Sequence, residues 1–122
     1  MIRIATLSAL LLFVPLAPAV VSAQTPPALS LEQTSTIRCA AAFALVADGQ
    51  ARGNEAALAY PPMADRGREF FVRASAHLMD QTGMSRADVA AVLGKEAQDI
   101  WGKGVLDTMM PPCLIMLAAS GV

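Results

Sequence analysis

Cys39 and Cys113 are the only cysteines of the 122-residue chain, and they stand 74 positions apart. In an oxidising compartment such a lone pair is expected to form a disulfide. The bridge would tie the first helix of a small fold to the last, and the chain-entropy model gives a loop of this length a stabilisation of about 4 kcal/mol. A redox-active or metal-binding pair is disfavoured because neither cysteine stands in a C-x-x-C motif or has a nearby histidine.

The first 23 residues are typical of a secretory signal peptide. Arg3 precedes an apolar run over residues 7–14, and the small residues Ser22 and Ala23 precede Gln24. An uncleaved anchor needs about 20 uninterrupted apolar residues, and prolines interrupt this segment. We therefore expect export to the periplasm of a Gram-negative bacterium, which is the compartment that the disulfide requires.

Removal of the signal peptide leaves 99 residues, with eight basic and ten acidic side chains. This balance produces no long-range field that would attract nucleic acid, and the apolar content is that of a folded protein. The longest later apolar stretch, residues 39–47, is too short to span a membrane, so we expect no stable membrane insertion after cleavage. The expected organisation is a signal peptide over 1–23, a flexible leader over 24–29 and a single helical domain over 30–122.

Helical periodicity and capping motifs predict an all-α fold, a small bundle of four or five helices without strands. Two capping boxes, Ser30 with Gln33 and Ser85 with Asp88, mark helix starts. The expected helical segments run over residues 30–52, 55–59, 63–82, 85–102, 105–109 and 113–119, the second and fifth being short turns. Because residues 39–47 are apolar on every face, we expect them to be the most buried part of the fold.

Proline and glycine residues indicate where the helices should be interrupted or closely packed. Pro61-Pro62 and Pro111-Pro112 should each break the helical path, because a proline removes a backbone donor and restricts the residue before it. Gly67 stands inside a predicted helix, where glycine costs about 1 kcal/mol relative to alanine. Such a glycine is expected where another group comes close, and the rings of Tyr60, Phe70 or Trp101 are the candidates.

The chain lacks the motifs of the common catalytic and cofactor-binding classes. His77 is the only histidine, which excludes multi-histidine metal sites and the usual haem attachment motif. No nucleophile elbow, phosphate-binding loop or dinucleotide fingerprint is present. We therefore expect no enzyme activity, no metal site and no cofactor.

His77 has three interpretations. It lies three residues before Asp80 on a predicted helix, so the simplest is a boundary histidine held by that carboxylate. A second is a pH sensor made of His77 and Asp80. The third, a catalytic base, is the weakest because no nucleophile is paired with the imidazole in the sequence.

Arginines and methionines supply the candidate partner-binding residues. Arg68 and Arg73 are spaced for helical ion pairs with Asp65 and Glu69, which would neutralise that face. Alternatively, three arginines of this segment could bind a partner's acid, and an exposed apolar surface is expected beside Pro111-Pro112. The candidates for these two roles are Arg66, Arg68, Arg73, Met109 and Met110.

These observations favour a non-enzymatic interaction module of the cell envelope. It would bind a protein or peptide through an apolar, Met-rich surface, in a chaperone-like, inhibitory or accessory role. The alternative is a carrier of a small apolar ligand, held in an internal cavity between the helices. That cavity would be lined by Phe70, Phe71, Met79, Leu93 and Met116.

Overall fold

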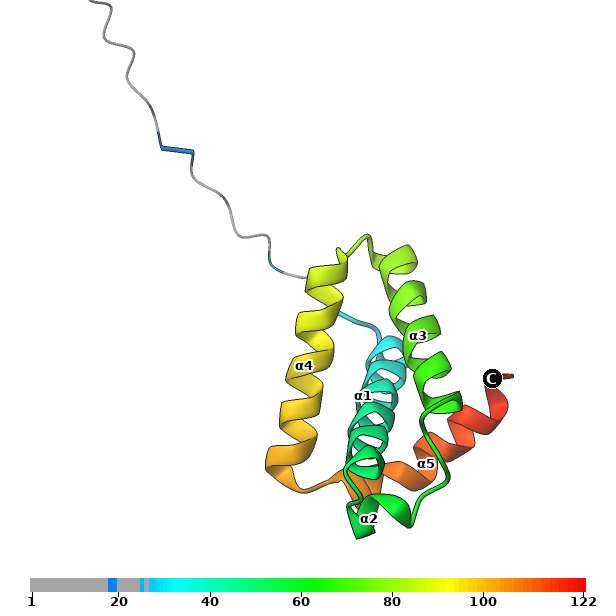
Figure 1. Ribbon diagram of the computed structural model, residues 1–122. Helices are drawn as coiled ribbons and strands as arrows, with labels where there is room; N and C mark the ends of the chain where they lie inside the picture. Colours follow the sequence, from blue (N-terminus) through cyan, green and yellow to red (C-terminus); the bar gives the residue numbers. More distant parts are fainter. Residues whose placement is uncertain (1–17, 20–24, 26) are drawn as a thin grey trace, which may run out of the picture.

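The computed structural model describes residues 18–19, 25 and 27–122. This part of the chain is all-helical, and its five helices are connected by short turns (Figure 1). Their bounds are α1 (Leu31–Ala51), α2 (Glu55–Leu58), α3 (Arg66–Thr82), α4 (Arg86–Lys103) and α5 (Leu106–Ala119). The signal-peptide prediction falls almost wholly outside the described residues. Within the predicted leader, residues 27–29 are not helical, and Leu29 packs against the core.

Helix α1 is the centre of the fold and packs against each of the other four helices. Most of residues 39–47 is buried, as the sequence predicts, and Ala40, Ala42 and Phe43 are completely inaccessible to solvent, but Ala44 is exposed. The Phe43 ring meets the Phe70 ring of α3 edge to face, with ring centroids 5.2 Å apart. Helices α3 and α4 run antiparallel and flank α1 in the view of Figure 1, and α5 crosses α1 and α3.

The helix starts predicted from capping motifs are confirmed. The Ser30 hydroxyl accepts from the Gln33 backbone N–H, and the Gln33 side chain accepts from the Ser30 N–H. Ser85 and Asp88 form the same reciprocal pair at the start of α4. The Ser85 hydroxyl also donates to the Asp88 carboxylate at 2.6 Å, and this bond, together with that from the Ser85 backbone N–H, lowers the pKa of the Asp88 carboxyl. Because these motifs act within four residues, they are readable without knowledge of the tertiary fold.

The predicted disulfide joins Cys39 of α1 to Cys113 of α5. Both cysteines are buried, so the bridge forms part of the core at the crossing of the two helices. It closes the predicted loop of 74 positions.

The predicted break at Pro111-Pro112 is wrong, because α5 continues through both prolines. The missing amide hydrogens leave the carbonyls of Asp107 and Thr108 without a donor within the helix, but both residues are exposed and water can bond these groups. On the opposite side, α5 buries residues before and after the prolines. Tertiary packing and the disulfide therefore hold a helix that local propensity disfavours. The buried residues are Met110, Cys113 and Leu117.

The prediction for Gly67 is correct about close approach but wrong about the neighbour. A Cβ at this position would lie 3.1 Å from Met63 Cβ and 3.3 Å from Phe43 Cβ, and no aromatic ring is the closest contact. Met63 itself is almost fully buried. The glycine therefore makes room for α3 and the preceding loop to pack directly on α1.

The segment between α2 and α3 is organised by one side chain of α1. The Gln50 amide nitrogen lies 3.0 Å from the Ala57 carbonyl oxygen, 3.2 Å from that of Tyr60 and 2.9 Å from that of Pro61. Its amide oxygen accepts from the Met63 N–H at 2.9 Å. This network holds Met63 outside the helix, so α3 begins at Arg66 and not at residue 63 as predicted.

Candidate functional site

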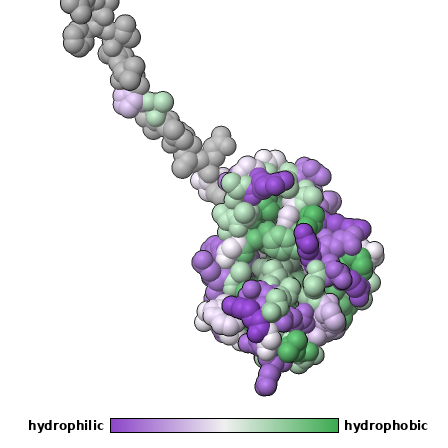
Figure 2. Space-filling view, in the orientation of Figure 1, coloured by the Kyte–Doolittle hydropathy of each residue, from purple (hydrophilic) through white to green (hydrophobic). Residues whose placement is uncertain are grey.

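The strongest candidate binding surface is a groove between α3 and α4, with a volume of 400 Å³. Both helices pack on α1 more extensively than on each other, which leaves a furrow along their outer side. Figure 2 shows apolar atoms running down the middle of this face, with hydrophilic groups on both sides. We name this surface the α3–α4 groove. It is lined by Phe71, Val72, Ser75, Ala76, Met79, Arg86, Val89, Ala90 and Leu93.

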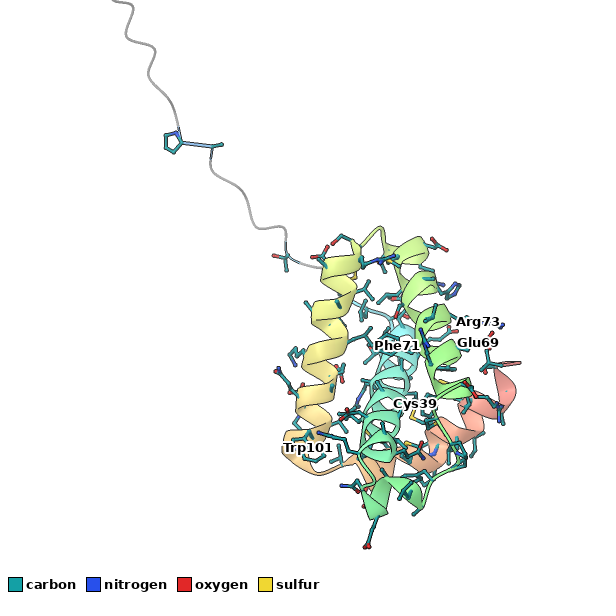
Figure 3. All side chains as sticks on the ribbon, in the orientation of Figure 1. Cys39, Glu69, Phe71, Arg73 and Trp101 are labelled. Carbon is teal, nitrogen blue, oxygen red and sulfur yellow. A yellow bond between two sulfur atoms is a disulfide. The ribbon has the colours of Figure 1, made fainter. Side chains whose placement is uncertain are left out.

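The lining of the α3–α4 groove combines a packed base with accessible walls. Val89 and Leu93 are buried, Phe71 and Met79 are half-buried, and Val72 is 56% exposed. The Phe71 side chain lies on the side of α3 that faces α4 (Figure 3). Helical spacing explains this arrangement, since positions 71, 72, 75 and 79 fall on one face of α3. An incoming apolar group could therefore bury accessible carbon surface without any change of the backbone.

Arg86 is the only charged residue that lines the α3–α4 groove. It is exposed and makes no hydrogen bond or ion pair with the residues that the structure describes through its side chain. Its guanidinium group can therefore pair with an acid on a bound partner. Sequence reasoning missed Arg86, because its position beside the groove depends on the packing of α4 on α1.

The three arginines predicted to bind a partner all lie on α3, and two of them are already paired within the chain. Arg73 pairs with Glu69 on the side of α3 away from Phe71, which confirms the predicted ion pair (Figure 3). Arg66 donates from Nε to the backbone oxygen of Val122 at 2.8 Å, so it points toward the end of α5. Arg68 is exposed and forms no ion pair within the described chain, and the predicted pair with Asp65 is not formed.

His77 and Asp80 are both exposed on α3. No hydrogen bond or ion pair joins them in the described structure, so the predicted hold by Asp80 is not observed. His77 instead lines a small groove of 190 Å³ together with Arg73 and the end of α5. Asp80, the predicted partner, is not among the residues that line this groove.

The methionines do not form one exposed surface. Met110 is completely buried in the core, so the prediction that it binds a partner is wrong. Because α5 continues through Pro111-Pro112, Met110 occupies an inward-facing helical position. Met109 is half-buried, and its sulfur lies 3.7 Å from a guanidinium nitrogen of Arg38.

The five residues proposed to line a ligand cavity are also distributed over several places. Phe71, Met79 and Leu93 lie together in the α3–α4 groove. Phe70 is buried beside α5, and Met116 lines a different groove near the disulfide. The periodicity of the sequence identified three groove residues, but it could not show which apolar faces meet.

No group of three or more His, Cys, Asp or Glu side chains in the described part of the chain lies close enough to hold a metal ion. No described helix is both long enough and apolar enough to cross a bilayer.

Comparison of the chain with protein-family models, with curated protein sequences and with solved structures found no match.

Proposed function

We propose that this chain is an exported, non-enzymatic interaction module that binds a protein or peptide partner in the α3–α4 groove. The observation that carries the proposal is the open apolar groove of 400 Å³ between two helices, with Arg86 as its only charge. An amphipathic helix or an apolar peptide segment that carries an acidic residue has the matching chemistry. This is the helix-in-groove mode of recognition, in which apolar anchors supply affinity and a charge sets orientation.

The disulfide supports the proposed periplasmic location. Disulfides form and persist in oxidising compartments, and the bridge between buried Cys39 and Cys113 is such a bond. The predicted signal peptide would direct the chain to a compartment of this kind. A rigid bundle also suits this function, because a preformed groove loses little conformational entropy when a partner binds. A chaperone-like, inhibitory or accessory role is compatible with such a surface.

Photo-crosslinking in the native host tests this proposal. A photoreactive amino acid would replace Val72 or Ala90, which line the groove, and Gln98, an exposed α4 residue outside it, as the matched control. We expect a discrete polypeptide adduct from positions 72 and 90 and none from position 98. Val72→Asp should abolish the adduct from position 90, because it places an anion in the apolar wall. The absence of polypeptide adducts at both groove positions, or equal adducts at position 98, would contradict the proposal.

The second candidate is a carrier of a small apolar ligand, and one observation favours it. The volume of the groove falls within the range of about 300–1,000 Å³ that is usual for small-molecule sites. Native mass spectrometry of the protein recovered from its own host distinguishes the two functions. A bound mass of small-molecule size that Val72→Asp removes would favour the carrier, whereas a bound polypeptide would favour the interaction module.

A further inference from the structure

A second groove, with a volume of 640 Å³, lies at the end of the bundle where α2, the end of α4 and the start of α5 meet. The only tryptophan and the only tyrosine of the sequence, Trp101 and Tyr60, both line it. Trp101 is 70% exposed, which leaves most of a large aromatic side chain open to solvent (Figure 3). We name this surface the Trp101 groove. An exposed tryptophan in a groove is a typical feature of a binding site, because its burial by a ligand is strongly favourable.

Polar side chains with unused hydrogen-bonding capacity line the same groove. Asp107 accepts from the Tyr60 hydroxyl through Oδ1, at 2.6 Å, while its Oδ2 has no partner among the described residues. Asn54 uses its Oδ1 to cap α2 and leaves its Nδ2 group free within that same part of the chain. Arg52 pairs with Asp48 through a terminal nitrogen, and a guanidinium group carries five N–H donors in all. The groove therefore offers both donors and an acceptor beside an aromatic surface.

The charges of the Trp101 groove restrict the class of ligand. Arg52 and Asp107 are its only charged lining residues, and their formal charges cancel. An anionic ligand would meet the Asp107 carboxylate, and a cationic ligand would meet the Arg52 guanidinium. A purely apolar segment offers no hydrogen-bonding group to the exposed side chains of Arg52, Asn54 and Asp107. A neutral ligand that carries many hydrogen-bonding groups meets none of these objections.

We propose that the Trp101 groove is a binding site for a neutral saccharide. A sugar ring presents a flat face of C–H groups, which can stack on the indole of Trp101, and a rim of hydroxyl groups. Because each hydroxyl both donates and accepts, it can pair with Asp107 as well as with Arg52 or Asn54. The site is separate from the α3–α4 groove, and the two share no lining residue.

Intrinsic fluorescence tests this inference directly, since Trp101 is the only tryptophan. The disulfide-bonded protein would be titrated with neutral oligosaccharides of glucose and of N-acetylglucosamine, and calorimetry would measure the same affinities without an optical probe. We expect a saturable change of Trp101 emission and a matching heat of binding with at least one series. Trp101→Ala should weaken the affinity measured by calorimetry by about tenfold or more, the scale of a truncated hot-spot residue.

Three variants separate loss of the site from loss of the fold. Trp101→Phe keeps an aromatic face and should retain more affinity than Trp101→Ala. Arg52→Met keeps the apolar stem, removes the donors and should weaken binding. Lys95→Met, which removes a similar exposed ion pair outside both grooves, should leave the affinity unchanged. Thermal unfolding would confirm that each variant is folded. No saturable binding of either saccharide series, or equal affinity in Trp101→Ala and the native protein, would overturn the proposal, as would emission changes produced only by charged or apolar peptides.

Discussion

The Tyr60 hydroxyl donates a 2.6 Å hydrogen bond to Oδ1 of Asp107, and this bond fastens the loop after α2 to the first turn of α5. The same contact raises the pKa of the Tyr60 phenol above 10.0, because the hydrogen bond to Asp107 favours the protonated form. Partial burial and the negative charge of the Asp107 carboxylate act in the same direction. The protonation state of Tyr60 is thus coupled to the integrity of this end of the bundle.

The Tyr60 contact predicts a specific loss of stability in alkali. A group whose pKa is raised by folding stabilises the native state fully below its unfolded pKa, and the contribution disappears as the pH rises through the folded value. We expect the free energy of unfolding to decrease from about pH 10 upward, the ordinary pKa of tyrosine. Lys95, whose pKa is raised mainly by its hydrogen bond to Asp99, contributes in the same direction.

Tyr60→Phe isolates the tyrosine contribution from that of Lys95. The variant should be less stable than the native protein at neutral pH, and the difference should shrink as the pH rises. Urea denaturation over the alkaline range measures both profiles. A stability difference that stays constant across this range would show that the Tyr60 phenol is not coupled to folding.

Gly49 and Gly94 are predicted to respond to the same substitution with opposite signs. A Cβ at Gly49 would lie 2.7 Å from the Ala57 Cβ, where α1 packs on α2, whereas a Cβ at Gly94 would meet no atom within 4 Å. Gly49→Ala should destabilise the fold by about 1–3 kcal/mol through overpacking. Gly94→Ala should stabilise it by about 0.5–1 kcal/mol through the helix propensity of alanine. Chemical denaturation of both variants checks this pair, and a stable Gly49→Ala variant would refute the close contact.

Gln50 is expected to be sensitive to the loss of its amide nitrogen. Gln50→Glu keeps the size of the side chain but replaces the amide nitrogen with a carboxylate oxygen. The three carbonyl groups that this nitrogen contacts would then face an acceptor and not a donor. We expect a loss of about 1 kcal/mol, the lower end of the cost of unpaired polar groups, because these carbonyls are only partly buried or exposed. Gln98→Glu, on the exposed face of α4, is the matched control and should change stability little. Acidification should restore part of the stability of Gln50→Glu alone, because a protonated glutamate regains one donor.

Removal of the disulfide should lower stability by about 4 kcal/mol, the value expected for a loop of this length. The double variant Cys39→Ala with Cys113→Ala avoids leaving an unpaired thiol in the core. Equilibrium denaturation with and without a reductant measures the effect, and the reductant should change the native protein but not the double variant. Equal denaturation midpoints for the two proteins would contradict a stabilising bridge.

Local sequence signals predicted the helix starts, and long-range packing explains where the structure differs from the prediction. The capping boxes at Ser30 and Ser85 lie within single turns, so the sequence predicts the starts of α1 and α4 correctly. Pro111-Pro112 carries an equally local signal, but buried Met110 and Cys113 overcome it, and this error also placed Met110 on the surface.

The candidate sites were harder to predict because they lie where separate helices meet. Phe71, Met79 and Leu93 were recognised as apolar face residues, but Arg86 joins them only through the packing of two helices on α1. In the same way, Trp101 lines one groove with Tyr60 and Asp107 only because α2, α4 and α5 come together at one end of the bundle. Periodicity identifies the face of a helix, but it carries no information about the partner of that face.

The central position of α1 determines how the molecule can come apart. The outer helices share α1 as their main partner and contact one another much less, so no pair of them encloses a core of its own. If α1 separates from the bundle, the other four helices lose their main packing partner at the same time. If one outer helix separates, an apolar side of α1 becomes exposed to water. Opening should therefore be all-or-none, with the amide hydrogens of α1, α3 and α4 exchanging through a common event.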